Sequence, residues 1–505
     1  MAMRRNWFSG GWWWLCCTVI GAGITCAVGQ NPPNNNQQPA KAPATTQAPA
    51  PACNVADGFT LAAVGDLIFS EPLSGLQDQP FQALLSRLRS ADATFGNLEN
   101  TLIDLQSFPG RPQAEYGGAH LRGSPAVAKD LRNMGFNLVS RANNHTTDWG
   151  IEGMRATDRA ADEAGLVHAG TGEDRTATRA AHYLQTAKGR VAMVSMTSSA
   201  TPISVPADAV GGAPGRPGVS ALRVTPYMIV SAEMMKSLRK IHDALPPAAL
   251  QAEEQEKRVL HPEDQEKHEG KPEELSLFGE KYRVGDKAVH FAYEMNESDL
   301  HQILKGIRDG KQNSDFLIAT IHAHEPDNWS EEPADFLPKL AHAAIDAGAD
   351  VFIGHGPHRL RAIEIYQGKP IFYSLGNFFF QIVTQGPVPA DLYEALKGDP
   401  NTLTGNEIMA KLLKGWFDTP VWYQSVIAVS RFEHGQVAEV RLYPVDLGLA
   451  AQGVNQGIPR PASPAVAKTI LEELQRLSKP YGTTIAIEDG VGIIRLARVT
   501  SAAGE

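Results

Sequence analysis

The sequence predicts an α/β protein, and three observations support that fold class. Strand-like apolar runs alternate with segments of helical spacing from residue 59 to about residue 356. The runs are as long as single strands, and several stop abruptly at Gly or at a polar residue, as buried strands do. The composition is that of a globular protein, with 43% hydrophobic and 20% charged residues among 505. The spacing is typical of βαβ units and of a largely parallel sheet.

The first half of the alternation extends to residue 199. Apolar residues recur every three to four positions in the segments between the runs, which favours helices there. In order, we expect a strand at 59–69, a helix at 84–93, a strand at 93–99, a helix at 127–136, a strand at 137–145, a helix at 154–165, a strand at 166–172 and a strand at 190–199.

The second half begins near residue 300 and ends in a tail without obvious chemistry. A His-Gly pair marks the turn of the first hairpin in this tail. In order, we expect a helix at 300–312, a strand at 316–325, a helix at 337–348, a strand at 350–356, a hairpin at 425–447, a helix at 463–482 and a final hairpin at 485–497.

The stretch at about residues 225–287 differs from its surroundings because it is charged, helix-forming and interrupted by Pro246 and Pro247. Runs of charge with almost no apolar face are usually solvated surfaces. We therefore interpret this stretch as a solvated helical insertion or lid arm, with a capping or partner-binding role as the alternative.

The N-terminus resembles an export signal over residues 1–29. Arg4 and Arg5 precede a short apolar core at residues 12–20, which is too short for a comfortable membrane span, and small residues follow at 27–29. We expect a protein exported to the periplasm or cell envelope. A lipoprotein signal ending at Cys26 and a retained anchor are alternatives.

Three further segments complete the organisation. Residues 30–55 are rich in Pro, Asn, Gln, Ala and Thr, which predicts a disordered linker. We place the main domain at 56–385 and the C-terminal strands and helix at 386–505. Cys53 is the lone cysteine after the signal, so the mature fold depends on its core and not on disulfides. The net charge of −10 argues against a nucleic-acid partner.

Polar residues of metal-ligand type follow five of the predicted strands. Because parallel strands bring their carboxyl ends to one edge of a sheet, we expect these loops to converge. The five groups are Gly65-Asp66, Gly96-Asn97-Leu98-Glu99, Ala142-Asn143-Asn144-His145, His322-Ala323-His324-Glu325 and Gly354-His355-Gly356-Pro357-His358.

Mixed carboxylate, amide and imidazole ligands suit Mn, Fe or Zn, and two such ions could polarise a phosphoryl or acyl oxygen. A free imidazole such as His145 could protonate a leaving group. Each residue alone has a structural alternative: Asp66 as a turn or helix cap, Asn144 as a left-handed residue, and His322 as an ordinary strand-end histidine. Their recurrence at strand ends favours a shared site for one or two divalent ions.

The motifs GDLIF, FGNLEN, RANNHTTDWG, IHAHE and GHGPHRLRAIEIYQGKPIFYSLGNF together resemble the bacterial CapA proteins of poly-γ-glutamate capsule synthesis. The resemblance covers about residues 59–385. That family is related to the calcineurin-like metallophosphatases, so the resemblance implies a four-layer α/β/β/α sandwich, completed by the C-terminal strands and helix, with metals at the strand ends.

The resemblance also implies roles for individual residues. Asp66, Glu99, Asn144, His322, His355 and His358 are expected as metal ligands, with Glu99 as the bridging carboxylate and His324 as an alternate to His322. Asn144 and His145 match the Asn-His pair, with His145 as the catalytic imidazole.

Two departures from the phosphatase pattern bear on the chemistry. Ile68 stands where those enzymes have a ligand histidine, and the expected bridging residue is Glu99 rather than an aspartate. A full dinuclear centre and a phosphatase substrate therefore do not follow from the resemblance.

The implied function is the synthesis, export or trimming of poly-γ-glutamate or a related capsule polymer, by metal-assisted hydrolysis or transfer at an amide or phosphoester. The expected partners are an anionic capsule or envelope polymer and membrane-bound capsule machinery. A periplasmic metal-dependent phosphoesterase and a non-catalytic polymer-binding or assembly factor are the two alternatives.

Overall fold

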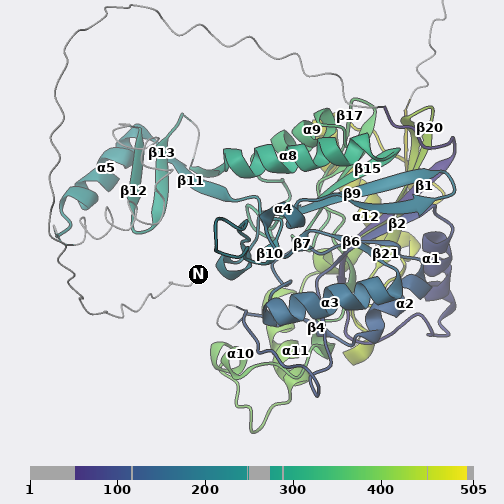
Figure 1. Cartoon of the computed structure of the whole chain (residues 1–505), viewed down its shortest axis with the longest axis horizontal. Helices are drawn as coiled ribbons and strands as arrows, with labels where there is room; N and C mark the ends of the chain where they lie inside the picture. Colours follow the sequence, from purple (N-terminus) through teal and green to yellow (C-terminus); the bar gives the residue numbers. More distant parts are fainter. Residues whose placement is uncertain are drawn as a thin grey trace, which may run out of the picture. The chain divides into compact units, whose positions relative to one another are not determined.

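The computed structural model describes residues 52–114, 118–246, 248, 273–286, 289–451 and 453–496 (Figure 1). The predicted export signal and most of the predicted linker lie outside these residues, as does most of the charged stretch at 249–272. Within the described ranges, every helix is too short or too polar to cross a bilayer.

The first large sheet is built around β1, which pairs in parallel with β2 and antiparallel with β20. The C-terminal hairpins extend the sheet on the β20 side, and β19 pairs with the last residues of β1. The strand order is β23 (Ala486–Glu488), β24 (Val491–Arg495), β21 (Gln436–Asp446), β20 (Gln424–Glu433), β1 (Phe59–Ile68), β2 (Ala93–Leu98), β5 (Leu138–Ser140) and β6 (Val167–Ala169), with β19 (Asn377–Phe380) and β22 (Arg460–Pro461) off this path.

The second large sheet has a parallel centre and antiparallel edges. Strand β15 pairs in parallel with both β9 and β16, and β16 pairs in parallel with β18. The order is β17 (Ile363–Tyr366), β18 (Lys369–Phe372), β16 (Val351–His355), β15 (Phe316–His322), β9 (Gly189–Thr197) and β8 (His182–Thr186). The predicted parallel strands are thus divided between two sheets.

Alternate residues of β15 show how the core is layered, since successive side chains of a strand point to opposite faces. Phe316 and Ile318 join a buried cluster that also contains residues of β1 and β2 from the first sheet. Leu317 and Ala319 join a different cluster, with α8 and α9. A third cluster packs α1, α2 and α3 on the other face of the first sheet. The result is a mixed α/β fold with several sheets.

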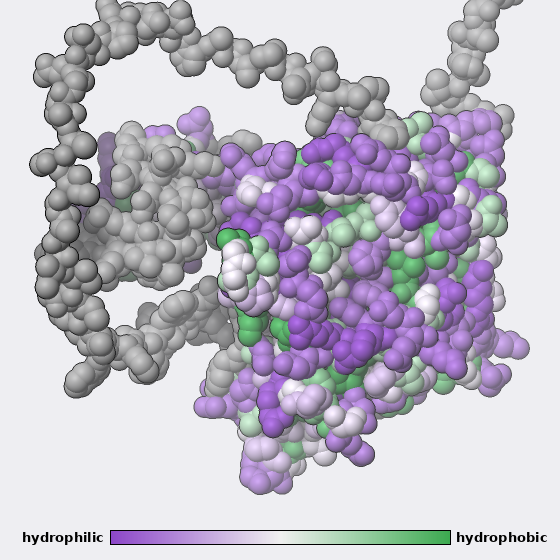
Figure 2. Space-filling view, in the orientation of Figure 1, coloured by the Kyte–Doolittle hydropathy of each residue, from purple (hydrophilic) through white to green (hydrophobic). Residues whose placement is uncertain are grey.

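The helices cover the outer faces of the two sheets with one apolar side each. In Figure 2 the exposed sides of α3 and α8 are mostly hydrophilic, as expected for amphipathic surface helices. Helices α2 and α3 end at Gly135 and Gly165, whose φ angles of 112° and 70° favour glycine. The helices are α1 (Gln79–Arg89), α2 (Ala126–Met134), α3 (Gly150–Ala164), α4 (Arg175–Thr178), α5 (Ala232–Asp243), α8 (Glu297–Gln312), α9 (Phe336–Asp346), α10 (Ala390–Ala395), α11 (Gly405–Trp416) and α12 (Pro464–Ser478).

Three sequence-based expectations about segments need correction. The helix expected at 84–93 begins at Gln79, because the side chain of Asp78 caps the backbone N–H of Phe81. The strand expected at 137–145 ends at Ser140. The linker expected to end at residue 55 ends earlier, because Cys53 and Val55 are buried in the core between the sheets.

The insertion at 225–287 is not purely helical. Its described part contains α5 and three strands of a separate sheet, which β14 completes from just after the insertion, in the order β12, β13, β11 and β14. The apolar run of β11 indicates a strand, but the charged residues that follow it dominate the composition of the insertion and favoured a helical interpretation. The strands are β11 (Val224–Val230), β12 (Glu274–Leu277), β13 (Glu280–Val284) and β14 (His290–Met295).

A buried ion pair supports the end of the second sheet away from the polar loops. The carboxylate of Asp350, which is 1% exposed, accepts hydrogen bonds from Lys311 Nζ at 2.7 Å and from Leu317 N at 2.8 Å. Asp350→Ala should lower the free energy of unfolding in urea by about 3–5 kcal/mol, because it leaves the Lys311 ammonium buried without its carboxylate.

Asp309→Ala is the matched control for this prediction. Asp309 pairs with Lys305 on the surface of α8, with side-chain exposures of 54% and 63%, so its loss should cost less than about 1 kcal/mol. Equal losses for the two variants would contradict a stabilising role for the buried pair.

Candidate metal centre

The strand ends of the two sheets meet at one place. Asp66 lies beside Asn97 of β2 and Asn377 of β19 in the first sheet, and His322 lies beside His355 in the second. Two groups of side chains each bring their ligand atoms within 4.8 Å of one another. The groups are Asp66 with His322 and His355, and Asp66 with Glu99 and His358.

The backbone before Asp66 explains how its carboxylate reaches the second sheet. The pairing of β1 with β2 shifts register between Ala63 and Asp66, and such bulges re-aim side chains next to functional sites. Gly65 makes the close approach possible, since a Cβ there would lie 1.8 Å from the carbonyl oxygen of Gly376. The glycine of the GD pair is therefore required by local geometry.

In the first group, the carboxylate oxygen Asp66 Oδ1 lies 3.9 Å from His322 Nδ1 and 3.7 Å from His355 Nδ1. The two imidazole nitrogens are 3.1 Å apart. All three side chains are at most 1% exposed. Which of these nitrogens carries a proton follows from the partners on the far side of each ring.

Thr320 determines which ring nitrogen of His355 carries the proton. The Thr320 hydroxyl donates to the carbonyl oxygen of Ile353 at 2.8 Å, so it accepts the proton of His355 Nε2 at 2.9 Å. A neutral imidazole carries one proton. Nδ1 of His355 therefore presents a lone pair to Asp66.

His324 determines in the same way which ring nitrogen of His322 carries the proton. His324 Nδ1 donates to Asn328 Oδ1 at 2.7 Å, which leaves His324 Nε2 to accept from His322 Nε2 at 3.0 Å. His322 Nδ1 then also carries a lone pair. It accepts a hydrogen bond from Asn97 Nδ2 at 3.2 Å, which a bound cation would replace. Two lone pairs and a carboxylate that face one another form a donor set compatible with a cation.

The second group contains buried oxygen atoms without hydrogen-bond partners among the described residues. His358 Nδ1 lies 3.5 Å from Asp66 Oδ2 and 2.9 Å from Asn377 Oδ1. The oxygen Glu99 Oε2 is buried and has no hydrogen-bond partner among the described residues, and the same holds for Asn144 Oδ1 in the loop that carries His145. A buried acceptor without a partner calls for an explanation, and a cation beside Glu99 is one that fits.

Burial sets the protonation states of this cluster. It lowers the pKa of His355 to about 4 and that of His324 to about 3, and it lowers the pKa of His322 well below its ordinary value. Burial alone would raise the pKa of Asp66, but its hydrogen bond to His358 and the neighbouring imidazoles hold it below its ordinary value. Neutral imidazoles and an ionised carboxylate are the forms that bind metal.

The pKa of Glu99 is shifted in the opposite direction to that of Asp66. Burial, together with the negative charges of Asp66 and Asp148, raises the pKa of Glu99 well above its ordinary value. Glu99 would therefore have to lose a proton before it could act as a carboxylate ligand.

His145 lies at the edge of the cluster with one nitrogen directed toward it. Its Nδ1 is 2.7 Å from Asp148 Oδ2, which also accepts from Leu121 N at 2.9 Å. Its Nε2 lies 3.8 Å from Glu99 Oε2, and the side chain is 15% exposed. Asp148 thus holds the ring so that Nε2 remains available on the side of the cluster.

The structure places five of the sequence-predicted ligands close together, since Asp66, Glu99, His322, His355 and His358 supply the two groups. His145 lies beside Glu99. The role of Asn144 as a ligand stays a prediction. Asp66 is shared by both groups, whereas the sequence assigned the bridging position to Glu99.

Three other positions clarify the site. Ile68 is 1% exposed and belongs to the apolar core, so it offers no ligand. Sequence reasoning left Asn97 and Asp148 out of the site. Asn97 lies two residues before Glu99, the spacing of side chains on one face of a strand, and Asp148 lies three residues after His145 in a turn. Both spacings are visible in the sequence and could have placed these two residues at the site.

Comparison with known proteins gives the chain relatives over most of its length. A family model described as "Bacterial capsule synthesis protein PGA_cap" matches residues 60–382. The uncharacterized protein y4sH of Sinorhizobium fredii is 50% identical over 455 residues, which are 88% of this chain and 95% of that protein.

Two relatives carry capsule names. The capsule biosynthesis protein CapA of Bacillus anthracis is 24% identical over 327 residues, 64% of this chain and 60% of that protein. The PGA biosynthesis protein CapA of Bacillus subtilis is 24% identical over 331 residues, 64% of each chain. A structure of the NAD nucleotidase of Haemophilus influenzae aligns with a TM-score of 0.31 at 10% identity, over 83% of this chain and 62% of that one, which is too distant to inform the fold.

Proposed function

This chain belongs to the bacterial capsule synthesis protein PGA_cap family, and from that premise we propose that it acts on poly-γ-glutamate or a related capsule polymer by metal-assisted hydrolysis or transfer. The observation that carries the proposal is the buried cluster of Asp66, His322 and His355. Two neutral imidazoles that present lone pairs to an ionised carboxylate form a site made for a cation.

The proposal extends to the architecture and the location of the protein. Two sheets that share a core, with helices on their outer faces, support the four-layer α/β/β/α sandwich that the resemblance implies. Residues 1–29 support export to the periplasm or cell envelope, where an anionic polymer and membrane-bound capsule machinery would be the partners.

Asp66, His322 and His355 would hold one divalent ion of the Mn, Fe or Zn type. Asp66, Glu99 and His358, together with the amide of Asn144, would hold a second. A bound ion of this kind polarises a carbonyl or phosphoryl oxygen and lowers the pKa of water. The apolar side chain of Ile68 leaves the second site short of an imidazole, which favours a weaker second ion.

The protein's own residues would manage the proton. In the hydrolysis of a γ-glutamyl amide, the oxygen of water bonds to the carbonyl carbon, the C–N bond breaks, and the departing nitrogen takes a proton. His145 Nε2 is placed to take a proton from the water and to pass it to that nitrogen, because Asp148 accepts from the other ring nitrogen. Asp148 would act as a positioning residue that fixes the ring.

The test of this function is turnover by the purified chain loaded with Mn²⁺. We expect cleavage of γ-glutamyl oligomers, followed by the appearance of new amino groups, and little cleavage of a phosphodiester model substrate. Cleavage of the phosphodiester alone would contradict the proposal in favour of a phosphoesterase.

A non-catalytic assembly factor is a second possibility, and the buried Ile68 is the observation that favours it. It predicts that the polymer is retained on the metal-loaded protein without new amino groups. Retention that is indifferent to His145→Ala would support this second function and contradict the first.

A further inference from the structure

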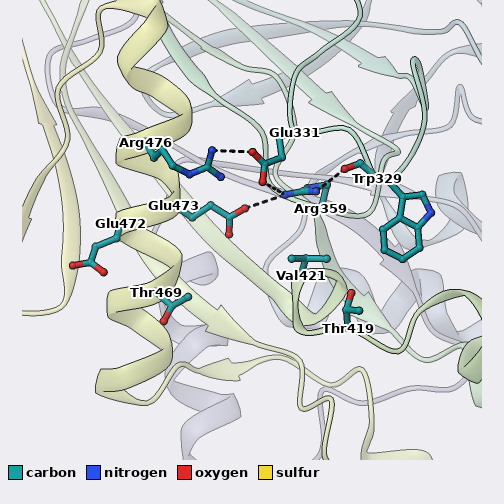
Figure 3. A pocket seen from close by; sticks show the side chains of 9 residues that line it. All are labelled: Trp329, Glu331, Arg359, Thr419, Val421, Thr469, Glu472, Glu473 and Arg476. Carbon is teal, nitrogen blue, oxygen red and sulfur yellow. Dashed lines mark hydrogen bonds and ion pairs between the residues drawn. The ribbon is translucent and has the colours of Figure 1, made fainter.

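An open pocket adjoins the candidate metal centre and takes no part in it. The cavity has a volume of about 630 Å³ and lies between α12, the short helix η3 (Pro420–Tyr423) and the segment around Trp329 (Figure 3). Side chains of both charges line it together with an aromatic surface. This combination of chemistry is not accounted for by the cluster of strand-end ligands.

Neighbouring residues connect the pocket with the metal centre. Arg359, which lines the pocket, directly follows His358. The ring of Phe417 lies 5.6 Å from that of His358 and 5.4 Å from that of Trp422, and Trp422 lies 4.8 Å from Trp329. A row of aromatic rings therefore connects His358 of the cluster with Trp329 at the pocket.

Two arginine side chains fix the backbone of the segment that carries Trp329. Arg361, which is fully buried, donates to the carbonyl oxygens of Glu325 at 2.9 Å and Asp327 at 2.9 Å. Arg359 Nη1 donates to the carbonyl oxygen of Trp329 at 2.7 Å. The indole of Trp329 is nevertheless 58% exposed, so a fixed backbone presents an apolar face to solvent at the pocket.

Arg359 offers a buried donor to the pocket. Its Nη2 contacts Glu473 Oε1 at 3.1 Å and Glu331 Oε1 at 3.3 Å, and Figure 3 shows the guanidinium between the two carboxylates. Arg359 is 5% exposed, and its Nε has no hydrogen-bond partner. Because Nε itself has almost no accessible surface, Arg359 contributes to the cavity wall through its guanidinium end beside Glu331 and Glu473.

The charges of the lining exclude a simple polyanion site. Three carboxylates, those of Glu331, Glu472 and Glu473, stand against the two guanidinium groups of Arg359 and Arg476. Glu331 is paired with both arginines, whereas Glu473 bonds Arg359 through Oε1. Glu472 pairs with Lys468 and points away from Glu473 (Figure 3), so the acidic group that remains for a ligand on the α12 side is Glu473, next to the guanidinium groups and the indole.

We propose that this pocket binds the amino end of a γ-glutamyl chain. The free α-ammonium group, present only at that end, would lie against Glu473. The neighbouring α-carboxylate would accept from Arg476, and the methylene groups would cover Trp329. Units inside the chain carry a carboxylate and an amide but no ammonium, so they would be disfavoured by the acidic lining.

This inference rests on the proposed function for the identity of the polymer, but its test does not need turnover. Calorimetry of the full chain in chelator should show that a γ-glutamyl tetramer with a free amino end binds about tenfold more tightly than its N-acetylated form, because acetylation removes the charge. Turnover could fail while this preference holds, and the preference could fail while turnover holds.

Two variants and one matched control localise the binding. Glu473→Gln keeps the acceptor for Arg359 and removes the charge, and it should abolish the preference for the free amino end. Trp329→Ala should weaken the free tetramer about tenfold. Trp416→Ala is the control, since Trp416 is 57% exposed and lies outside the pocket lining, and it should change nothing.

Three results would overturn the inference. One is equal affinity for the free and acetylated tetramers. Another is a preference that survives both Glu473→Gln and Trp329→Ala. The last is binding of free glutamate as tight as that of the tetramer, which would make the pocket a site for a single amino acid.

Discussion

Asp66→Asn is expected to remove nearly all bound divalent metal from the protein. Asp66 is the one side chain shared by both groups of ligand atoms, and its charge is what the neutral imidazoles of His322 and His355 lack. The amide keeps the size of the carboxylate, although its NH2 group replaces an oxygen that accepts from either Asn97 Nδ2 or Gly356 N. The affinity for Mn²⁺ should fall by at least about 100-fold, measured as metal content after reconstitution and dialysis.

Asp162→Asn is the control for this loss. Asp162 lies beside His168, with a side chain that is 72% exposed and belongs to neither ligand group, so its metal content should match that of the wild type. If Asp66→Asn retains the same metal as the wild type, the ion is bound elsewhere and the proposed centre is wrong.

His145→Ala is expected to lower turnover of a γ-glutamyl oligomer by about 10²–10⁴-fold while the metal remains bound. His145 belongs to neither ligand group, and its Nε2 is the free nitrogen beside Glu99. Rates should be compared at equal metal content, so that loss of the proton donor is separated from loss of the ion.

Two companion variants sharpen this prediction. Asp148→Ala should lower turnover less than His145→Ala, because it leaves the imidazole and removes only the group that orients it. His301→Ala, on the exposed surface of α8, should have no effect. Unchanged turnover in metal-loaded His145→Ala would assign the proton transfer to another group.

Much of the candidate site could be predicted because its residues follow buried strands. An apolar run that stops at Asp66, His322 or His355 is visible in the sequence, and strand ends converge in any parallel sheet. The shared role of Asp66 could not be predicted, since it depends on a register shift in β1 that re-aims the side chain.

The fold was only partly predictable for a similar reason. Strand periodicity does not say which sheet a strand joins, so the alternation alone did not separate β1 and β2 from β15 and β16. The insertion was read as helical because charge dominated its composition, whereas β11 pairs with β14, a strand 60 residues further along the chain. Pairing between strands that lie so far apart in the chain leaves little trace in the local pattern of residues.

The most direct measurement is the position of the ion in crystals of the full chain grown with Mn²⁺ and recorded at an anomalous wavelength. The account predicts a peak roughly 2 Å from Asp66 and from the Nδ1 atoms of His322 and His355. Mn²⁺ found only on exposed carboxylates, with these three side chains still in contact with one another, would contradict it.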